Sequence, residues 1–190
     1  GACAVTMDAA KSVTATFTLN IYALDVTKTG TGSGTVSSAP IGINCGADCT
    51  ETYDYNTVVT VTATADTGTT FSGWSGACTG TGTCAVTMDA AKSVTATFTL
   101  NTYAIDITKT GTGSGTVSST PLGISCGADC TETYDYNTVV ALTATADTGT
   151  TFTGWSGACA GTGACAVTMD AAKSVVATFT LNTYELTLSK

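Results

Sequence analysis

The stretch FSGWSGACTGTGTCAVTMDAAKSVTATFTLN, residues 71–101, occurs again almost unchanged at residues 152–182. Its second half occurs a third time at residues 1–20. The repeat unit is 81 residues long, as the spacing of three equivalent cysteines shows: Cys3, Cys84 and Cys165. A fixed period of this kind indicates that the chain is built from similar structural units arranged in tandem.

The period divides the chain into two complete repeats and two partial ones. We expect the complete repeats at residues 20–100 and 101–181. Residues 1–19 then correspond to the C-terminal part of a truncated repeat, and residues 182–190 to the first strand of the next one. The sequence is therefore interpreted as a segment of a longer repetitive polypeptide.

Charged residues are scarce and unbalanced, because six Lys stand against fourteen acidic residues and give a net charge of −8. This excess of negative charge disfavours binding to nucleic acids and to anionic lipid surfaces. The apolar runs are only a few residues long, so the sequence predicts no membrane span. The chain contains no His, and a Ser nucleophile would lack its usual general base. We therefore expect neither enzyme activity nor a cofactor.

Short stretches of alternating polar and apolar residues predict β-strands throughout each repeat. Residues 59–65, VTVTATA, alternate strictly and place Val and Ala on one face and Thr on the other. Turn signals that contain Gly separate these stretches, and no apolar period of 3.6 residues is long enough for a helix. The pattern is typical of an all-β unit, either a β-sandwich or a compact β-roll.

The boundary between the two complete repeats contains neither Gly nor Pro, since residues 98–103 read FTLNTY. The last strand of one repeat is expected to continue almost directly into the first strand of the next. Such a junction cannot act as a flexible linker. The sequence therefore predicts that the repeats form a rigid rod.

Each complete repeat contains five motifs in the same order, which in the first are GSGTV (32–36), CGADC (45–49), VTVTATA (59–65), FSGWSG (71–76) and VTATF (94–98). The order of these motifs resembles the divergent internalin B-repeat family, whose tandem modules occur in large bacterial surface and secreted proteins. The resemblance covers the whole chain. It implies a β-rich stalk or spacer module without known catalytic residues and without an agreed ligand site.

Each complete repeat contains two closely spaced pairs of cysteines that are candidates for disulfides. The short spacing favours local pairing, although four cysteines permit three connectivities, and a four-cysteine zinc site is the alternative. Disulfides predict an oxidising, extracellular location, which we interpret as the surface of a bacterium or a secreted filament. Cys3 is expected to be unpaired within the given sequence. The candidate disulfide cysteines are Cys45, Cys49, Cys78, Cys84, Cys126, Cys130, Cys159 and Cys165.

Aromatic and acidic side chains supply the remaining candidate sites. Trp74 and Trp155 could serve as platforms for sugar rings, but a Trp flanked by Gly can also fill a core. Asp48, Glu51 and Asp66 are candidates for a Ca²⁺ site, although their spacing does not fit the usual loop motif. Four Tyr residues beside an Asp are candidates for core-edge positions or for contacts between neighbouring chains: Tyr53, Tyr55, Tyr134 and Tyr136.

These features together favour a structural role. We expect an extracellular bacterial repeat module that forms a stiff surface filament or stalk through tandem and inter-chain association of its β-repeats. Its partners would be copies of itself, or a surface anchor and a terminal adhesin. The alternative is an adhesive module that binds a glycan or a host protein through exposed Tyr and Trp loops, where near-identical repeats would add avidity.

Overall fold

The computed structural model describes all residues, 1–190, and consists of β-strands joined by turns and loops. It contains no helix that is long and apolar enough to span a bilayer. The first repeat comprises β1 (Ile21–Thr29), β2 (Gly34–Ala39), β3 (Thr50–Asp54), β4 (Val58–Ala65), β5 (Thr69–Gly76), β6 (Cys84–Thr87) and β7 (Lys92–Leu100). The second comprises β8 (Thr102–Thr110), β9 (Gly115–Thr120), β10 (Thr131–Asp135), β11 (Val139–Ala146), β12 (Thr150–Gly157), β13 (Cys165–Thr168) and β14 (Lys173–Leu181).

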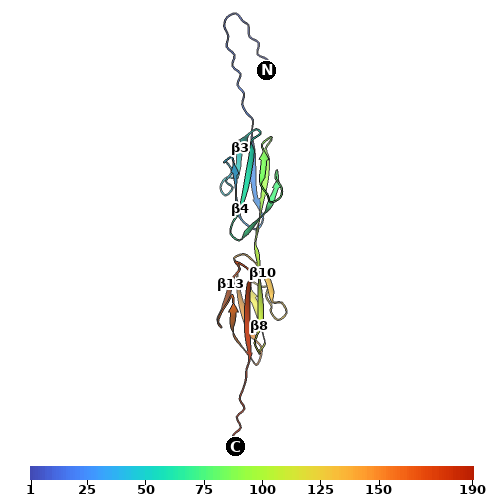
Figure 1. Ribbon diagram of the computed structural model, residues 1–190, viewed down its shortest axis with the longest axis vertical. Helices are drawn as coiled ribbons and strands as arrows, with labels where there is room; N and C mark the ends of the chain where they lie inside the picture. Colours follow the sequence, from blue (N-terminus) through green and yellow to red (C-terminus); the bar gives the residue numbers. More distant parts are fainter.

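Each repeat is a β-sandwich of one four-stranded and one three-stranded sheet (Figure 1). In the first repeat the strand order is β3-β1-β7-β5 in the larger sheet and β2-β4-β6 in the smaller one. The second repeat has the equivalent sheets, β10-β8-β14-β12 and β13-β11-β9. The two sheets of each repeat enclose a single core of 15 buried residues. The all-β tandem fold predicted from the sequence is confirmed, and the sandwich is the architecture adopted.

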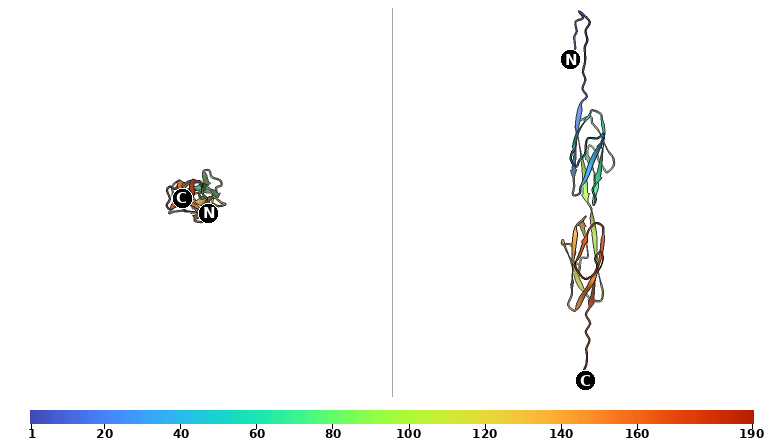
Figure 2. Two further views of the ribbon diagram at one scale, coloured as in Figure 1. Left: turned by 90° about the horizontal axis from the view of Figure 1, so that it is seen from below. Right: turned by 90° about the vertical axis from the view of Figure 1, so that its left-hand side faces the viewer.

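The first and last strands of each repeat lie side by side and run in the same direction. β1 pairs with β7 in parallel, from Leu24 opposite Lys92 to Thr29 opposite Thr97, and β8 pairs with β14 in the same way. A parallel pair places the start of its first strand and the end of its second strand at opposite ends of the sheet. The chain therefore enters each repeat at one end and leaves at the other, and the repeats follow each other along one axis (Figures 1 and 2).

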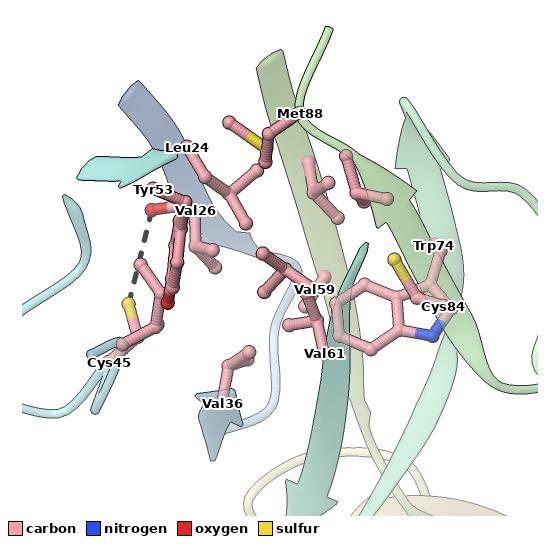
Figure 3. Close-up of a cluster of buried hydrophobic side chains, with 14 of the residues drawn as sticks. Leu24, Val26, Val36, Cys45, Tyr53, Val59, Val61, Trp74, Cys84 and Met88 are labelled. Carbon is pink, nitrogen blue, oxygen red and sulfur yellow. Dashed lines mark hydrogen bonds between the residues drawn. The ribbon is translucent and has the colours of Figure 1, made fainter. Parts of the chain in front are cut away.

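Alternate residues of most strands point into the core, as the sequence pattern predicts. In β4, Val59 and Val61 are buried while Thr62 and Thr64 are exposed. The side chains of the two sheets meet in the space between them (Figure 3). Phe98 of β7 is the largest of the fully buried side chains in this repeat.

The glycine-rich loop between β1 and β2 crosses over the end of β7 at close range. Gly30 has a φ of +102°, and a β-carbon at this position would overlap the carbonyl oxygen of Phe98. A β-carbon on Gly34 would overlap the Phe98 ring. The N–H of Gly32 donates a hydrogen bond of 3.0 Å to the same carbonyl. These glycines permit close packing on β7 in addition to the turn geometry expected from the sequence.

Residues 1–20 form no strand, although residues 3–20 copy the sequence of β6, β7 and the turn between them. In the first repeat, β7 pairs with β1 and β5, whereas residues 1–20 pair with no strand. The apolar side chains of these residues are consequently exposed, whereas their counterparts in the repeat are covered. Phe17 is 91% exposed, while the equivalent Phe98 is 1% exposed.

Replacing Phe98 with Ala is expected to destabilise the first repeat strongly. The substitution removes a fully buried aromatic ring, and truncations of this kind cost about 3–5 kcal/mol. A loss of this size is expected in the free energy of unfolding of the first repeat, measured by urea titration with NMR signals assigned to each repeat. Phe17→Ala makes the same change in the exposed copy and should leave stability unchanged. Equal losses in the two variants would contradict this description of the core.

Candidate functional site

The cysteines of each repeat form two local disulfides. In the first repeat these are Cys45–Cys49 and Cys78–Cys84. The labelled cysteines Cys45 and Cys84 lie on opposite sides of the core (Figure 3), so the four sulfurs are not brought together as a zinc site would require. The sulfur of Cys45 lies 3.9 Å from the carbonyl oxygen of Val26, which places this disulfide against β1 (Figure 3). The second repeat has the equivalent pairs, Cys126–Cys130 and Cys159–Cys165, while Cys3 is exposed and unpaired.

Trp74 lies in the core beneath the loop that the Cys78–Cys84 disulfide closes. Its indole Nε1–H donates to the carbonyl of Gly82 at 3.0 Å, and its backbone N–H donates to the carbonyl of Gly80 at 2.7 Å. The ring meets that of Phe71 with centroids 4.9 Å apart. Only 6% of Trp74 is exposed, and Trp155 has the same surroundings in the second repeat. A sugar platform needs an open aromatic face, so these positions suit core packing instead.

The four candidate Tyr residues fall into two groups with different surroundings. Tyr53 is 7% exposed, and its hydroxyl lies 2.8 Å from the hydroxyl of Ser38. Tyr55 is 45% exposed and stands edge-on to Tyr22, with the ring centroids 6.3 Å apart. The difference arises because β3 ends at Asp54, so strand alternation no longer sets the direction of the next side chain. In the second repeat, Tyr134 is buried like Tyr53, whereas Tyr136 is half-buried and lies beside Gly68 of the first repeat.

The three candidate Ca²⁺ ligands are engaged locally and do not converge. The carboxylate of Asp48 accepts from the N–H of Thr50 at 3.2 Å, and that of Glu51 accepts from the N–H of Thr52 at 2.7 Å. Asp66 begins the turn between β4 and β5, where its carbonyl accepts a hydrogen bond from Thr69. No group of three or more His, Cys, Asp or Glu side chains is placed to hold a metal ion.

Each copy of the motif DAAK forms a salt bridge between its first and last residues. In the first repeat, Lys92 Nζ lies 2.6 Å from the Asp89 carboxylate, and its hydrogen bond and charge lower the pKa of Asp89. The pKa of Asp8 in residues 1–20 is lowered by the same contact with Lys11. A lowered folded-state pKa adds stability above the unfolded-state pKa and loses it as the pH falls through the folded value. Because the pair also forms outside a folded repeat, this contribution is small. The remaining copy is Asp170–Lys173.

The junction between the repeats contains an arrangement that the sequence pattern does not predict. Asn101 is the single residue between β7 and β8. Its N–H donates to the carbonyl of Gly68 at 2.9 Å, and its own carbonyl accepts from the N–H of Tyr136 at 2.8 Å. The only sequence signal was the absence of Gly and Pro around Asn101, because Gly68 and Tyr136 are distant from it in the chain.

Comparisons with known proteins agree with the repeat structure. A sequence profile described as "Divergent InlB B-repeat domain" matches residues 24–102 and 105–183. No curated protein matches the chain. The structure is similar to the Bacillus anthracis TIE protein, with a TM-score of 0.52 and 9% sequence identity over 85% of this chain and 34% of that chain. This chain therefore spans about a third of the TIE protein chain, and the low identity supports a common fold alone.

Two pilus proteins are more distant structural matches. The C-terminal fragment of the pilus adhesin SpaC from Lactobacillus rhamnosus GG has a TM-score of 0.42 and 9% identity, over 88% of this chain and 100% of that chain. The major pilin T-13 from Streptococcus pyogenes has a TM-score of 0.37 and 12% identity, over 87% of this chain and 98% of that chain. These scores are too low to carry a conclusion about function.

Removing the disulfide next to Trp74 is expected to weaken the first repeat without abolishing its fold. The Cys78–Cys84 bond closes a small ring, for which the chain-entropy model gives about 2 kcal/mol. We expect the double variant Cys78→Ala, Cys84→Ala to lose about this amount of unfolding free energy in urea titrations. Cys3→Ala serves as the control, because it removes an unpaired cysteine and should leave the unfolding free energy unchanged. If Zn²⁺ restored the stability of the fully reduced wild-type chain, the disulfide assignment would be wrong.

Proposed function

The chain belongs to the divergent InlB B-repeat domain family, and on that premise we propose that its repeats act as stiff structural spacers in an extracellular bacterial stalk or surface filament. The proposal involves neither catalysis nor a cofactor. The division into units at residues 20–100 and 101–181 is part of it. Each unit would add a fixed length to the array and hold whatever lies beyond it away from the cell.

The observation that carries this proposal is the parallel pairing of the first and last strands in each repeat. Because β1 and β7 run in the same direction, the exit of one repeat lies at the end opposite to its entry. β8 starts after a single intervening residue, Asn101. Consecutive repeats are therefore placed end to end and not folded back on each other, which is the arrangement that a spacer requires.

Several further features support an extracellular setting and self-association. Two disulfides in each repeat suit an oxidising compartment. Residues 3–20 carry the sequence of β6 and β7 with exposed apolar side chains. We propose that this segment completes a sheet in a neighbouring unit or chain. In a filament the partners would be copies of this chain. In a stalk they would be a surface anchor and a terminal adhesin.

An adhesive function is the second candidate, and exposed side chains at equivalent positions of the two repeats favour it. Ile41 and Leu122 are exposed in the loop that follows the second strand of each repeat. Tyr55 is also exposed, whereas both Trp side chains are buried. A ligand of this module would therefore contact Tyr55 or the loop that contains Ile41, and not the buried Trp side chains.

Small-angle X-ray scattering tests the spacer function directly. For the wild-type chain we expect a distance distribution with one well-defined separation between the two repeats. A variant with Gly-Ser-Gly-Ser inserted after Asn101 is expected to show a broader distribution, because Gly/Ser segments behave as flexible coils. Equally broad distributions for the two proteins would contradict the proposal of a stiff spacer.

A glycan and host-protein array separates the two candidate functions. The spacer function predicts no saturable binding by the wild-type chain. Saturable binding that is lost in Tyr55→Ala or Ile41→Ser, with the fold retained by circular dichroism, would favour the adhesive module. Asp54→Asn is a suitable control, since it changes an exposed side chain beside Tyr55 without removing apolar surface.

A further inference from the structure

The junction between the repeats can be compared with the same residues at the outer ends of the chain. Tyr136 is half-buried at the junction, whereas the equivalent Tyr55 at the free end of the first repeat is 45% exposed. Leu100 is half-buried before the junction, whereas the equivalent Leu181 is 54% exposed. The local sequences are nearly the same, so the additional burial at the junction reflects the contact between the two repeats.

Gly68 provides the space for this contact. A β-carbon on Gly68 would overlap the ring of Tyr136, while a β-carbon on the equivalent Gly149 would meet no atom within 4 Å. The two glycines have nearly the same backbone conformation, with φ values of +77° and +80°. The left-handed conformation favours glycine at both positions. Only at Gly68 is the absence of a side chain also needed by the neighbouring repeat.

Both sides of the contact are held in place by their own repeats. The Gly68 turn is tied to the loop between β1 and β2, because the Thr69 hydroxyl donates to the carbonyl of Ser33 at 2.7 Å. On the other side, the Tyr136 ring stands edge-on to Tyr103 with the centroids 6.4 Å apart. The next residue, Asn137, donates its N–H to the carbonyl of Met169 at 3.0 Å. The contact therefore joins two well-supported surfaces.

Asn101 links these surfaces through its backbone, while its side chain bonds to the first repeat alone. Besides its hydrogen bonds to Gly68 and Tyr136, its side-chain carbonyl accepts from the hydroxyl of Thr70 at 2.6 Å. The outer ends each keep half of this arrangement, since Asn182 donates to Gly149 at 2.9 Å and Asn20 accepts from Tyr55 at 2.8 Å. The complete arrangement occurs only where two repeats meet.

We propose that Gly68, Asn101 and Tyr136 form a specific interface that sets the angle between consecutive repeats. The surface at the Gly68 end of one repeat accepts the tyrosine-bearing end of the next copy of the repeat. This inference rests on the proposed spacer function and identifies the residues on which stiffness depends. A side chain at Gly68 would displace the Tyr136 ring and leave Asn101 as the sole connection, so the repeats would reorient relative to each other.

Residual dipolar couplings measured on the weakly aligned full chain test this interface. In the wild type, the amides of β1–β7 and of β8–β14 are expected to fit one common alignment tensor. Gly68→Ala is expected to abolish the common fit and to give each repeat its own tensor. Gly149→Ala carries the same backbone strain in a position without the contact, and it should retain the common tensor.

A second pair of variants avoids any cost from the glycine backbone. Tyr136→Ala removes the ring at the junction, and Tyr55→Ala removes the equivalent ring at the free end, each with loss of one Tyr–Tyr contact within its own repeat. Loss of the common tensor is expected in Tyr136→Ala alone. Amide spectra that match the wild type away from each substitution establish that both repeats remain folded in all four variants.

The outcomes distinguish this inference from the function on which it rests. If the wild type fits one tensor and both Gly68→Ala and Tyr136→Ala still do, the interface assignment is overturned and the stiff spacer stands on strand continuity alone. If the wild type itself requires two tensors, the stiff spacer and the interface are both overturned. Loss of the common tensor in the two junction variants, with its retention in the two controls, supports the interface.

Discussion

The parallel pairing of β1 with β7 is the constraint on which the rest of the structure depends. Two parallel strands cannot be joined by a tight turn and need a long crossover connection. Here the crossover is the whole segment from β2 to β6. Part of it extends the larger sheet on both sides, and the remainder forms the smaller sheet that covers the core. The same pairing places the entry and the exit of the repeat at opposite ends of the sandwich, so the next repeat begins where this one ends.

The disulfides stabilise the parts of the repeat that strand pairing holds least well. Cys45–Cys49 closes the loop between β2 and β3, and Cys78–Cys84 closes the loop between β5 and β6. The second loop also folds over Trp74, whose indole hydrogen bond to Gly82 requires the loop to stay in place. Small β-units bury modest cores and often gain stability from such cross-links. The Cys78–Cys84 disulfide and the packing of Trp74 therefore stabilise the same loop, between β5 and β6.

The positions of the strands could be predicted from the sequence, but the order in which they pair within the sheets could not. Strict alternation over residues 59–65 located β4 to within one residue of its bounds, Val58–Ala65. Alternation indicates which side chains face the core. It does not indicate which strand lies alongside, so the parallel β1–β7 pair cannot be predicted from it. Cysteine spacing favours local disulfide pairing, because both partners lie in one short segment, but it leaves three connectivities open. The Gly68–Tyr136 contact joins residues that are far apart in the chain, so no local sequence pattern predicts it.

The parallel pair also determines how a repeat responds to tension. When the two ends of a repeat are pulled apart along the axis, β1 and β7 are loaded lengthwise and must slide past each other. The register from Leu24–Lys92 to Thr29–Thr97 joins the two strands along six residue pairs, and a shear load is shared among their hydrogen bonds. If the two strands were instead pulled apart from one end, perpendicular to their length, their hydrogen bonds would break one at a time. The ring-closing disulfides lie outside this pair, so the resistance to shear comes from the sheet itself.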